Sequence, residues 1–439
     1  MRILVWGLGY VGTVSAGCLA DLGNEVIGVE PHHPKVKAIN HGLCAIKEPG
    51  LQELVRATVE SSHFRATTDG LNLIPQSDIS LICVGTPNGA NGRPRLDAIE
   101  NVSRDIGRGL RHISHYHVVV IRSTVFPGTS RHLVRSILEE QSGKKAGEDF
   151  GLVMNPEFLR EGSAVNDFHT PSYTIIGELD KHSGELVDRL YQKINAPLKH
   201  VTLEEAELLK ITNNAFHALK VGFGNEIGRL CDHLRIDSHR LMELVCEDSK
   251  LNISPAYLRP GFAFGGSCLP KDLRFITYNA RRLGIEVPIL DAILYSNDLQ
   301  VTLARLKLQE IGFKNVGVLG LSFKPGTDDL RESPIIRLIQ DLWQDGFNVL
   351  VYDPDVNPTE MLGSNLAYLS RQLPQINDIL CDSFEQMLTQ CEVVVISQKR
   401  PGVLEAIQKF GQRLVILDLV RMTDHPERLM FKEYRGMSW

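Results

Sequence analysis

A single cysteine stands in a glycine-rich stretch whose residue types suit nucleophilic chemistry. Residues 261–272 read GFAFGGSCLPKD, so Cys268 follows Gly265 and Gly266 in a segment without strand or helix periodicity. Glycines would leave room for a substrate carbon beside the sulfur, and Lys271 would favour a thiolate. The other seven cysteines occupy apolar or helical contexts that are typical of structural residues. We therefore predict that Cys268 is a catalytic nucleophile.

A second motif, at the start of the chain, has the spacing of a dinucleotide-binding turn. Residues 7–12 read GLGYVG and follow an apolar run directly. Gly7 permits a tight turn, Gly9 admits a pyrophosphate against backbone amides, and Gly12 lets helix and strand pack closely. Glu30 ends the next apolar run, where its carboxylate would accept hydrogen bonds from a ribose and repel a 2′-phosphate. The motif therefore predicts NAD rather than NADP.

Two threonines follow apolar runs at positions where ligands bind in parallel sheets. Thr86 lies in VGTP, residues 84–87, and Thr124 lies in RSTVFPGT, residues 122–129. A lone threonine at such a place is more often a helix cap than a ligand contact. Their shared position beside the glycine turn makes both of them candidates for the cofactor site.

Polar residues form a line along a long predicted helix over residues 203–236. At 100° per residue, one narrow face carries Lys210, Asn214, His217 and Asn225. A helix face that only meets solvent usually carries more charge, in ion pairs four residues apart. One lysine with three amide or imidazole groups instead suggests the lining of a site.

Two glutamates lie in NPEFLREGSA, residues 155–164. We expect a helix here, with Asn155 as its cap and Pro156 in its first turn. Glu157 and Glu161 would then share one face, four residues apart. Acids in a first turn also suit the helix dipole, so Glu161 is the stronger candidate for a site.

A hydride acceptor combined with a thiol predicts a particular reaction. An alcohol that loses hydride to NAD becomes an aldehyde, and a thiolate adds to an aldehyde to give a thiohemiacetal. Loss of a second hydride gives a thioester, which water releases as an acid. The residues therefore predict an alcohol-to-acid dehydrogenase and leave the substrate open.

The elements that would position these residues alternate between apolar runs and amphipathic stretches, as in βαβ units. The expected strands are residues 2–7, 25–30, 79–85, 117–124 and 151–156, and then 315–321, 348–354, 392–397 and 414–419. We predict an α/β fold with two Rossmann-like doubly wound domains joined by a long central helix. The predicted boundaries are 1–202 for the NAD-binding domain, 203–302 for the helical segment with the cysteine loop, and 303–439 for the second domain.

Composition limits the class of protein. The chain has 439 residues, a net charge of −6 and no apolar run that approaches a membrane span. We expect neither a nucleic-acid nor a membrane partner, and the N-terminal run is expected to be a buried strand rather than a signal peptide. The eight cysteines are scattered without a C-x-x-C pair, so neither zinc nor a disulfide framework is expected and a reduced, cytoplasmic compartment fits best.

The motifs together resemble the UDP-glucose/GDP-mannose dehydrogenase family, whose members oxidise C6 of a nucleotide sugar to a carboxylate with NAD. The resemblance rests on GLGYVG, VGTP, RSTVFPGT, NPEFLREGSA, a helix with Lys210, Asn214, Asn225 and Glu226, GFAFGGSCLPKD, and GLSFKPGTDDLRESP at 320–334. These motifs span nearly the whole chain. Within the family, residues 249–272 and His217 favour GDP-mannose as the substrate, with UDP-glucose or another nucleotide sugar as the alternative.

The resemblance implies roles for residues at matching positions. Catalysis would use Cys268 as the nucleophile, Lys210 and Asn214 as stabilisers of charge on the C6 oxygen, Asp272 in proton transfer, and Glu161, Glu157 and Thr124. NAD would contact Gly7, Gly9, Tyr10, Val11, Gly12, Glu30, Lys35, Thr86, Thr124, Lys271 and Arg331. The substrate would contact Glu161, Lys210, Asn214, His217, Asn225, Tyr257, Arg259, Phe262, Gly265 and Lys324. The second α/β domain would bind the nucleotide. The resemblance also implies a homodimer with shared sites, which could assemble into a larger oligomer, and a role in making an alginate-type precursor.

Two departures from the family pattern stand out. Glu30 occupies a position that is usually aspartate, and Ala256 replaces a tyrosine of close relatives. A two-electron β-hydroxyacid dehydrogenase of related plan would not need Cys268, and a non-catalytic nucleotide-sugar sensor would produce no NADH. These two classes remain the alternatives to a nucleotide-sugar dehydrogenase.

Overall fold

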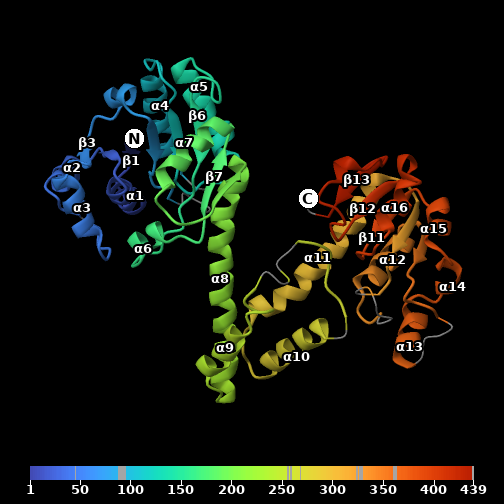
Figure 1. Cartoon of the computed structure of the whole chain (residues 1–439). Helices are drawn as coiled ribbons and strands as arrows, with labels where there is room; N and C mark the ends of the chain where they lie inside the picture. The colour runs from blue at the N-terminus through green and yellow to red at the C-terminus, as the bar shows by residue number, and fades with distance from the viewer. Residues whose placement is uncertain are drawn as a thin grey trace. The chain divides into compact units, whose positions relative to one another are not determined.

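The computed structural model divides into two compact units, Met1–Ala218 and Leu219–Trp439 (Figure 1). It describes residues 1–44, 46–87, 95–254, 257, 260–266, 268–322, 325, 330–358 and 363–437. The boundary between the units falls inside α8 (Leu203–Leu234), a 32-residue helix. Arg259 and Lys324, which were predicted to contact substrate, and Ala256 lie outside the described residues.

The first unit is built on an eight-stranded sheet with the order β3-β2-β1-β4-β5-β6-β7-β8. Neighbouring strands are parallel except for β6 and β7, which are antiparallel. The strands are β1 Arg2–Trp6, β2 Glu25–Val29, β3 Phe64–Thr67, β4 Ile79–Ile82, β5 Val118–Ile121, β6 Gly151–Met154, β7 Thr174–Glu178 and β8 Leu198–Val201. All five strands expected in this half are confirmed, and β3, β7 and β8 are additional.

Helices cover both faces of this sheet, because successive strand residues point to opposite sides. In β1, Ile3 and Val5 pack into one buried cluster, whereas Leu4 and Trp6 pack into another. The helices are α1 Tyr10–Asp21, α2 His33–Asn40, α3 Leu51–Glu60, α4 Asp97–Leu110, α5 Arg135–Ser142, α6 Ala164–His169 and α7 Lys181–Tyr191, with shorter helical turns η1 Leu71–Gln76 and η3 Thr129–Val134.

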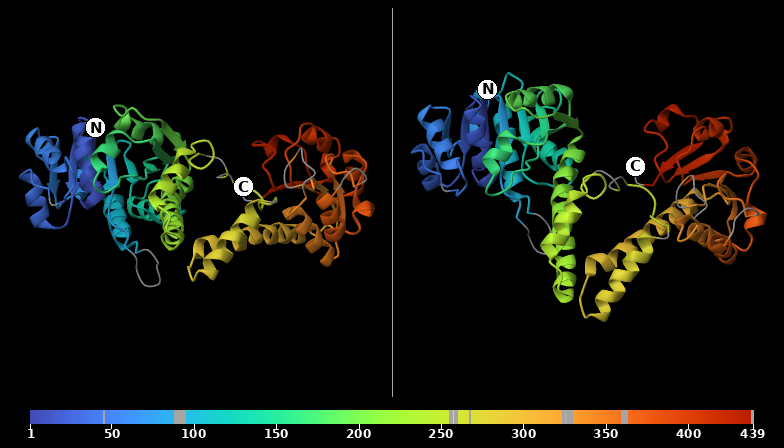
Figure 2. Two further views of the ribbon diagram at one scale, coloured as in Figure 1. Left: turned by 90° about the horizontal axis from the view of Figure 1, so that it is seen from below. Right: turned by 60° about the horizontal axis from the view of Figure 1, so that its bottom comes forward.

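The segment between the sheets is helical, with α9 at Ser238–Glu247, α10 at Leu269–Arg282 and α11 at Pro288–Ile311. The helices α10 and α11 lie side by side and pack around buried Ala280 and Leu290 (Figure 2). Glu226 of α8 accepts hydrogen bonds from the N–H groups of Ile289 and Leu290 at 2.8 and 3.1 Å, which satisfies donors at the start of α11.

The second sheet has five parallel strands in the order β10-β9-β11-β12-β13. They are β9 Asn315–Leu319, β10 Asn348–Tyr352, β11 Val393–Ile396, β12 Val415–Asp418 and β13 Glu433–Gly436. The helices are α12 Pro334–Gln344, α13 Gly363–Gln372, α14 Ile376–Ile379, α15 Phe384–Gln390 and α16 Val403–Gln408, with turns η4 Gly411–Arg413 and η5 Pro426–Arg428. Two buried clusters flank the sheet, so the predicted pair of doubly wound α/β folds and the long helix are confirmed.

Candidate active site and nucleotide-binding turns

The turn after β1 has the geometry of a pyrophosphate-binding loop. Gly7 has a φ of +89° and donates from its N–H to the carbonyl of Val29 at 2.9 Å. A Cβ on Gly12 would lie 1.8 Å from the carbonyl oxygen of Gly7, so α1 and the turn pack too closely for any side chain. Beside Gly9 nothing lies within 4 Å, which leaves space for a ligand. The arrangement fits a dinucleotide at the start of α1.

Glu30 lies at the mouth of this turn. Its carboxylate accepts hydrogen bonds from the N–H groups of Leu8 at 3.2 Å and His32 at 3.3 Å, and Lys35 lies 3.4 Å from it. The structure therefore brings together Glu30, Lys35 and the glycine turn. Tyr10 and Val11, the first two residues of α1, are partly buried against one core cluster of the first unit.

The loops after β4 and β5 are joined by direct hydrogen bonds beside the glycine turn. The hydroxyl of Thr86 donates to the carbonyl of Thr124 at 2.8 Å, and that of Ser123 donates to the carbonyl of Val84 at 2.6 Å. A Cβ on Gly7 would lie 2.8 Å from the Val84 side chain, so these loops border the turn. The predicted grouping of both threonines with the cofactor loop is consistent with this arrangement.

A buried ion pair lines a pocket of the first unit. Lys210 Nζ is 2.8 Å from Glu157 Oε1, and both side chains are less than one tenth exposed. The second Glu157 oxygen accepts the N–H of Leu159 at 2.7 Å. The pocket, about 470 Å³, is also lined by Asn214 and His217, so three members of the predicted polar face share it.

The predicted helix over residues 155–161 is wrong. That segment has no regular structure, and α6 begins only at Ala164. Asn155 is not a cap: its side-chain oxygen accepts from Arg122 Nη1 at 2.6 Å and from Tyr191 Oη at 2.5 Å, and its amide donates to Ile175. These long-range contacts hold the backbone extended, and they place Glu157 against Lys210.

Two residues that the sequence reasoning missed also line the pocket. Arg122 is 5% exposed and donates to Ser15 Oγ at 3.0 Å as well as to Asn155 and Tyr191. Asn213 donates to the hydroxyl of Tyr173 at 3.0 Å. Arg122 stands within the RSTVFPGT motif, and its position just after a buried strand was a signal that could have marked it.

Cys268 lies in the second unit and stands at the N-cap position of α10. The sulfur-bearing residue is exposed, and its carbonyl accepts the N–H of Asp272 at 2.9 Å. Since the positive end of a helix dipole stabilises anions, this position suits a thiolate. Lys271 and Asp272 form an exposed ion pair at 3.4 Å one turn into the helix.

The remaining cysteines fall into two groups. Burial raises the pKa of Cys18 and of Cys83 to about 12 and that of Cys391 to about 11, so they are inert structural residues. Cys246 differs from the expectation, because it is exposed on α9.

Before Cys268, close packing requires a glycine at Gly265, and the backbone conformation favours one at Gly266. A Cβ on Gly265 would lie 2.3 Å from the carbonyl oxygen of Glu332 and 2.7 Å from Pro334. Gly266 has a φ of +86°, a conformation that favours glycine. The suggestion that they open space beside the sulfur is therefore wrong for Gly265, where the space is filled by the turn before α12.

The other predicted contacts are scattered over the second unit. Asn225 is exposed on α8, Tyr257 is 87% exposed, and Arg331 is partly buried. Phe262 packs partly against the core of the second sheet. Glu161 is exposed in the first unit, in the turn before α6.

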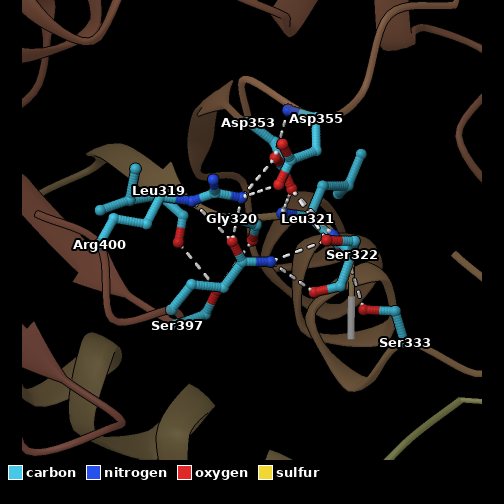
Figure 3. Close-up of polar contacts among 10 residues, drawn as sticks. Leu319, Gly320, Leu321, Ser322, Ser333, Asp353, Asp355, Ser397 and Arg400 are labelled. Atoms are coloured by element: carbon cyan, nitrogen blue, oxygen red, sulfur yellow. Dashed lines mark hydrogen bonds and ion pairs between the residues drawn. The ribbon is translucent and has the colours of Figure 1, made fainter. Parts of the chain in front are cut away.

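The second α/β fold repeats the backbone device of the first (Figure 3). Gly320 has a φ of +94° and donates to the carbonyl of Tyr352 at 2.9 Å, as Gly7 does to Val29. Asp353, at the end of β10, accepts the N–H groups of Leu321 and Ser322 at 2.7 and 3.1 Å. Here the acid is already occupied, because Arg400 Nη2 lies 3.0 Å from the buried carboxylate of Asp353.

Arg400 is part of a wider network around the turn after β9. It also pairs with Asp355 at 2.6 Å and donates from Nε to the side-chain oxygen Oε1 of Gln398 at 2.9 Å. The Gln398 amide donates to both the carbonyl and the hydroxyl of Ser322 at 2.8 Å (Figure 3). These contacts connect the turn after β9 to residues that follow β10 and β11.

The described part of the chain contains no group of three histidine, cysteine, aspartate or glutamate side chains that could hold a metal ion. In the same part, every helix is either too short or too polar to cross a membrane.

Three family models match the chain in order. The NAD-binding domain of the UDP-glucose/GDP-mannose dehydrogenase family matches residues 1–195, its central domain 204–299 and its UDP-binding domain 317–425. GDP-mannose 6-dehydrogenase of Pseudomonas putida is 45% identical over 100% of both chains. UDP-glucose 6-dehydrogenase of Haloferax volcanii is 38% identical over 81% of this chain and 83% of its own. A crystal structure of a ternary complex of GDP-mannose dehydrogenase from Pseudomonas aeruginosa has a TM-score of 0.96 and 42% identity and covers 100% of both chains.

Proposed function

The chain belongs to the UDP-glucose/GDP-mannose dehydrogenase family, and on that premise we propose that it oxidises the C6 alcohol of GDP-mannose to the carboxylate with NAD. It is an NAD-dependent nucleotide-sugar dehydrogenase. The observation that supports GDP-mannose is the higher identity and coverage of the relatives named for that sugar, 45% against 38% for the UDP-glucose enzyme of Haloferax volcanii.

The first unit's residues fit the cofactor. The open space beside Gly9, the tight packing at Gly12 and the carboxylate of Glu30 are the features that a dinucleotide requires. When bound, NAD accepts a hydride from C6 in each of two oxidation steps. Overall, one alcohol, two NAD⁺ and one water give one carboxylate, two NADH and three protons.

Lys210 and Asn214 would act on the C6 oxygen. In the first oxidation this oxygen loses a proton, and in the later steps it carries negative charge. The Lys210 ammonium lies in a pocket that also contains Asn214, and Glu157 holds it in place at 2.8 Å. The hydroxyl of Thr124 would assist in this proton transfer, since its loop borders the cofactor turn.

Cys268 would attack the aldehyde. The sulfur forms a bond to C6 and the carbonyl π bond breaks toward oxygen, which gives a thiohemiacetal. Loss of the second hydride restores the C=O bond and leaves a thioester. The α10 N-terminus would stabilise the attacking thiolate, and Asp272 would accept the thiol proton through water.

Hydrolysis completes the reaction. Glu161 would orient or deprotonate the water that attacks the thioester, and the C–S bond then breaks to return the thiolate. The nucleotide sugar would be held by the second α/β fold with help from Lys324, Arg259 and Tyr257, whereas Lys271 and Arg331 would reach the cofactor. Asn225, His217, Phe262 and Gly265 would complete the sugar's surroundings.

A homodimer, a cytoplasmic location and supply of an alginate-type precursor complete the proposal. The exposed apolar side chains of the helical segment support a dimer, because they include Val221, Phe275, Tyr278 and Tyr295, each more than 60% exposed in the single chain.

A substrate panel tests the function. Purified protein is given NAD with GDP-mannose, UDP-glucose or a 2-hydroxy acid, and NADH and the sugar product are both measured. We expect two NADH for each GDP-mannuronate formed, and no acid from Cys268→Ala. If the protein oxidises UDP-glucose but not GDP-mannose, the proposed substrate is contradicted. If the wild type releases an aldehyde as its final product, the thiol chemistry is contradicted.

A further inference from the structure

A buried carboxylate outside the predicted site links two of its parts. Glu48 lies just before α3 and is 7% exposed. It accepts three short hydrogen bonds, from the Tyr10 hydroxyl at 2.5 Å and from the N–H groups of Gly162 and Ala164, each at 2.7 Å. No motif of the sequence pointed to Glu48.

The donors come from the two sides of the reaction. Tyr10 is the first residue of α1 and follows Gly9 in the cofactor turn. Gly162 directly follows Glu161, and its N–H belongs to the peptide that joins the two residues. Glu48 therefore bonds at one end to the NAD-binding turn and at the other to the backbone of the segment that presents Glu161.

The link requires a carboxylate. Three donors converge on two oxygens, and no ion pair to Glu48 is formed within the described residues, so hydrogen bonds alone offset the cost of burying its charge. Burial opposes ionisation, but the bonds from Tyr10, Gly162 and Ala164 keep the pKa of Glu48 below its ordinary value. In turn, burial raises the pKa of Tyr10, with further contributions from Glu48 and from nearby Glu161.

We propose that Glu48 is a positioning residue that couples occupancy of the NAD turn to the placement of Glu161 at the sugar. Any movement of Tyr10 when the cofactor binds is transmitted through the shared carboxylate to the Gly162 peptide. The consequence is positive coupling between cofactor and nucleotide sugar, which by linkage acts equally in both directions. This inference rests on the proposed role of Glu161.

Binding measurements test the coupling without catalysis. The affinity of GDP-mannose is measured by calorimetry with and without saturating NADH, a pair that does not react. In the wild type we expect NADH to increase the affinity for GDP-mannose severalfold. Glu48→Gln keeps the shape but offers only one acceptor oxygen, so the factor should fall toward one, while NADH binding alone changes less than about threefold.

Matched variants complete the design. Glu53→Gln changes an exposed glutamate of the neighbouring α3 and should keep the wild-type factor. Tyr10→Phe removes one of the three hydrogen bonds to Glu48, so NADH should increase the affinity for GDP-mannose less than in the wild type. If Glu48→Gln does not fold, this variant tests the role of Glu48.

The outcomes separate the two proposals. A wild type without coupling, or a Glu48→Gln protein that folds and keeps it, would overturn the role of Glu48. A wild type that binds NADH but not GDP-mannose would overturn the proposed substrate instead, and the same measurement with the sugar that the panel identifies would then decide on Glu48.

Discussion

Glu157 and Lys210 form an ion pair in the pocket that we propose receives the sugar. Each is less than one tenth exposed, and their atoms are 2.8 Å apart. Removing one member of a buried pair leaves an uncompensated charge, whereas removing both does not. This asymmetry separates the contribution of the pair to stability from its contribution to chemistry.

Lys210→Met should therefore lower the free energy of unfolding by roughly 3–5 kcal/mol. The double variant Glu157→Gln, Lys210→Met should recover most of this loss in urea unfolding, while oxidation of the sugar remains at least about a hundredfold slower in both. Lys271→Met, which breaks an exposed pair, should cost less than about 1 kcal/mol. A double variant with restored activity would show that the ammonium has no role in the chemistry.

At the scale of elements, α11 holds the loop that leads to Cys268. The Asn297 side chain accepts the N–H of Phe264 at 2.8 Å and donates to the carbonyl of the same residue at 3.0 Å. Gln300, one turn along, donates to the carbonyl of Gly261 at 3.0 Å. The side-chain amides of Asn297 and Gln300 thus form the hydrogen bonds to the loop backbone that a neighbouring strand would form in a sheet.

Asn297→Ala should slow the chemical step by roughly tenfold or more, because small displacements of a nucleophile are costly. Gln300→Ala removes one bond farther from Cys268 and should have a smaller effect. Single-turnover NADH formation, monitored in stopped flow, measures this step. Equal rates for Asn297→Ala and the wild type would contradict the role of the loop contact.

The start of β5 makes stability dependent on pH. Burial lowers the pKa of His117 to about 4, and its ring contacts the Ser77 carbonyl at 2.8 Å and Ser80 Oγ at 3.0 Å. The unfolded histidine binds a proton below about pH 6.5, so the folded state loses about 2 kcal/mol between pH 7 and pH 5. In His117→Gln, chemical unfolding at pH 7 and pH 5 should show a decrease in the free energy of unfolding that is smaller than in the wild type by about 2 kcal/mol. If the decrease is the same in both proteins, other groups cause the pH dependence.

Most of the strands with buried apolar runs could be predicted from the sequence, although buried β7 was not expected. The strands β5 and β11 are continuous apolar runs, β1 and β4 are largely apolar, and all four were expected. The strands β3 and β8 have exposed residues, and their short polar segments carry little periodic signal. The extended segment after Asn155 depends on Arg122 and Tyr191, which are distant in sequence, so local cap signals predicted a helix there.

Site residues divide in the same way. Cys268, Lys210 and the glycine turn stand in motifs whose local spacing predicts the proposed chemistry. Glu48 and Asn297 act through partners more than 30 residues away, and a single sequence gives no measure of such proximity. The positioning residues therefore needed the structure.

At the scale of the whole molecule, the helical segment exposes several large apolar side chains. Phe275 is 70% exposed on α10 and Tyr295 is 68% exposed on α11. Phe275→Glu should therefore weaken the proposed homodimer by at least about tenfold, since it brings a charge into an apolar contact. Light scattering across a dilution series measures this change, with Met430→Glu as an exposed apolar control outside the segment. A wild type that is monomeric at every concentration would contradict the dimer.

The pairing of Asp353 with Arg400 predicts how many cofactor molecules one chain binds. Two folds carry the same glycine turn, but in the second one the acid that would meet a ribose is held by a guanidinium. Calorimetric titration should therefore saturate at one NADH per chain. A reaction that removes two hydrides must then send two cofactor molecules through one place in succession, and the half-oxidised sugar has to wait between them. Under the proposed chemistry, the bond to Cys268 is what keeps that sugar from leaving during the exchange.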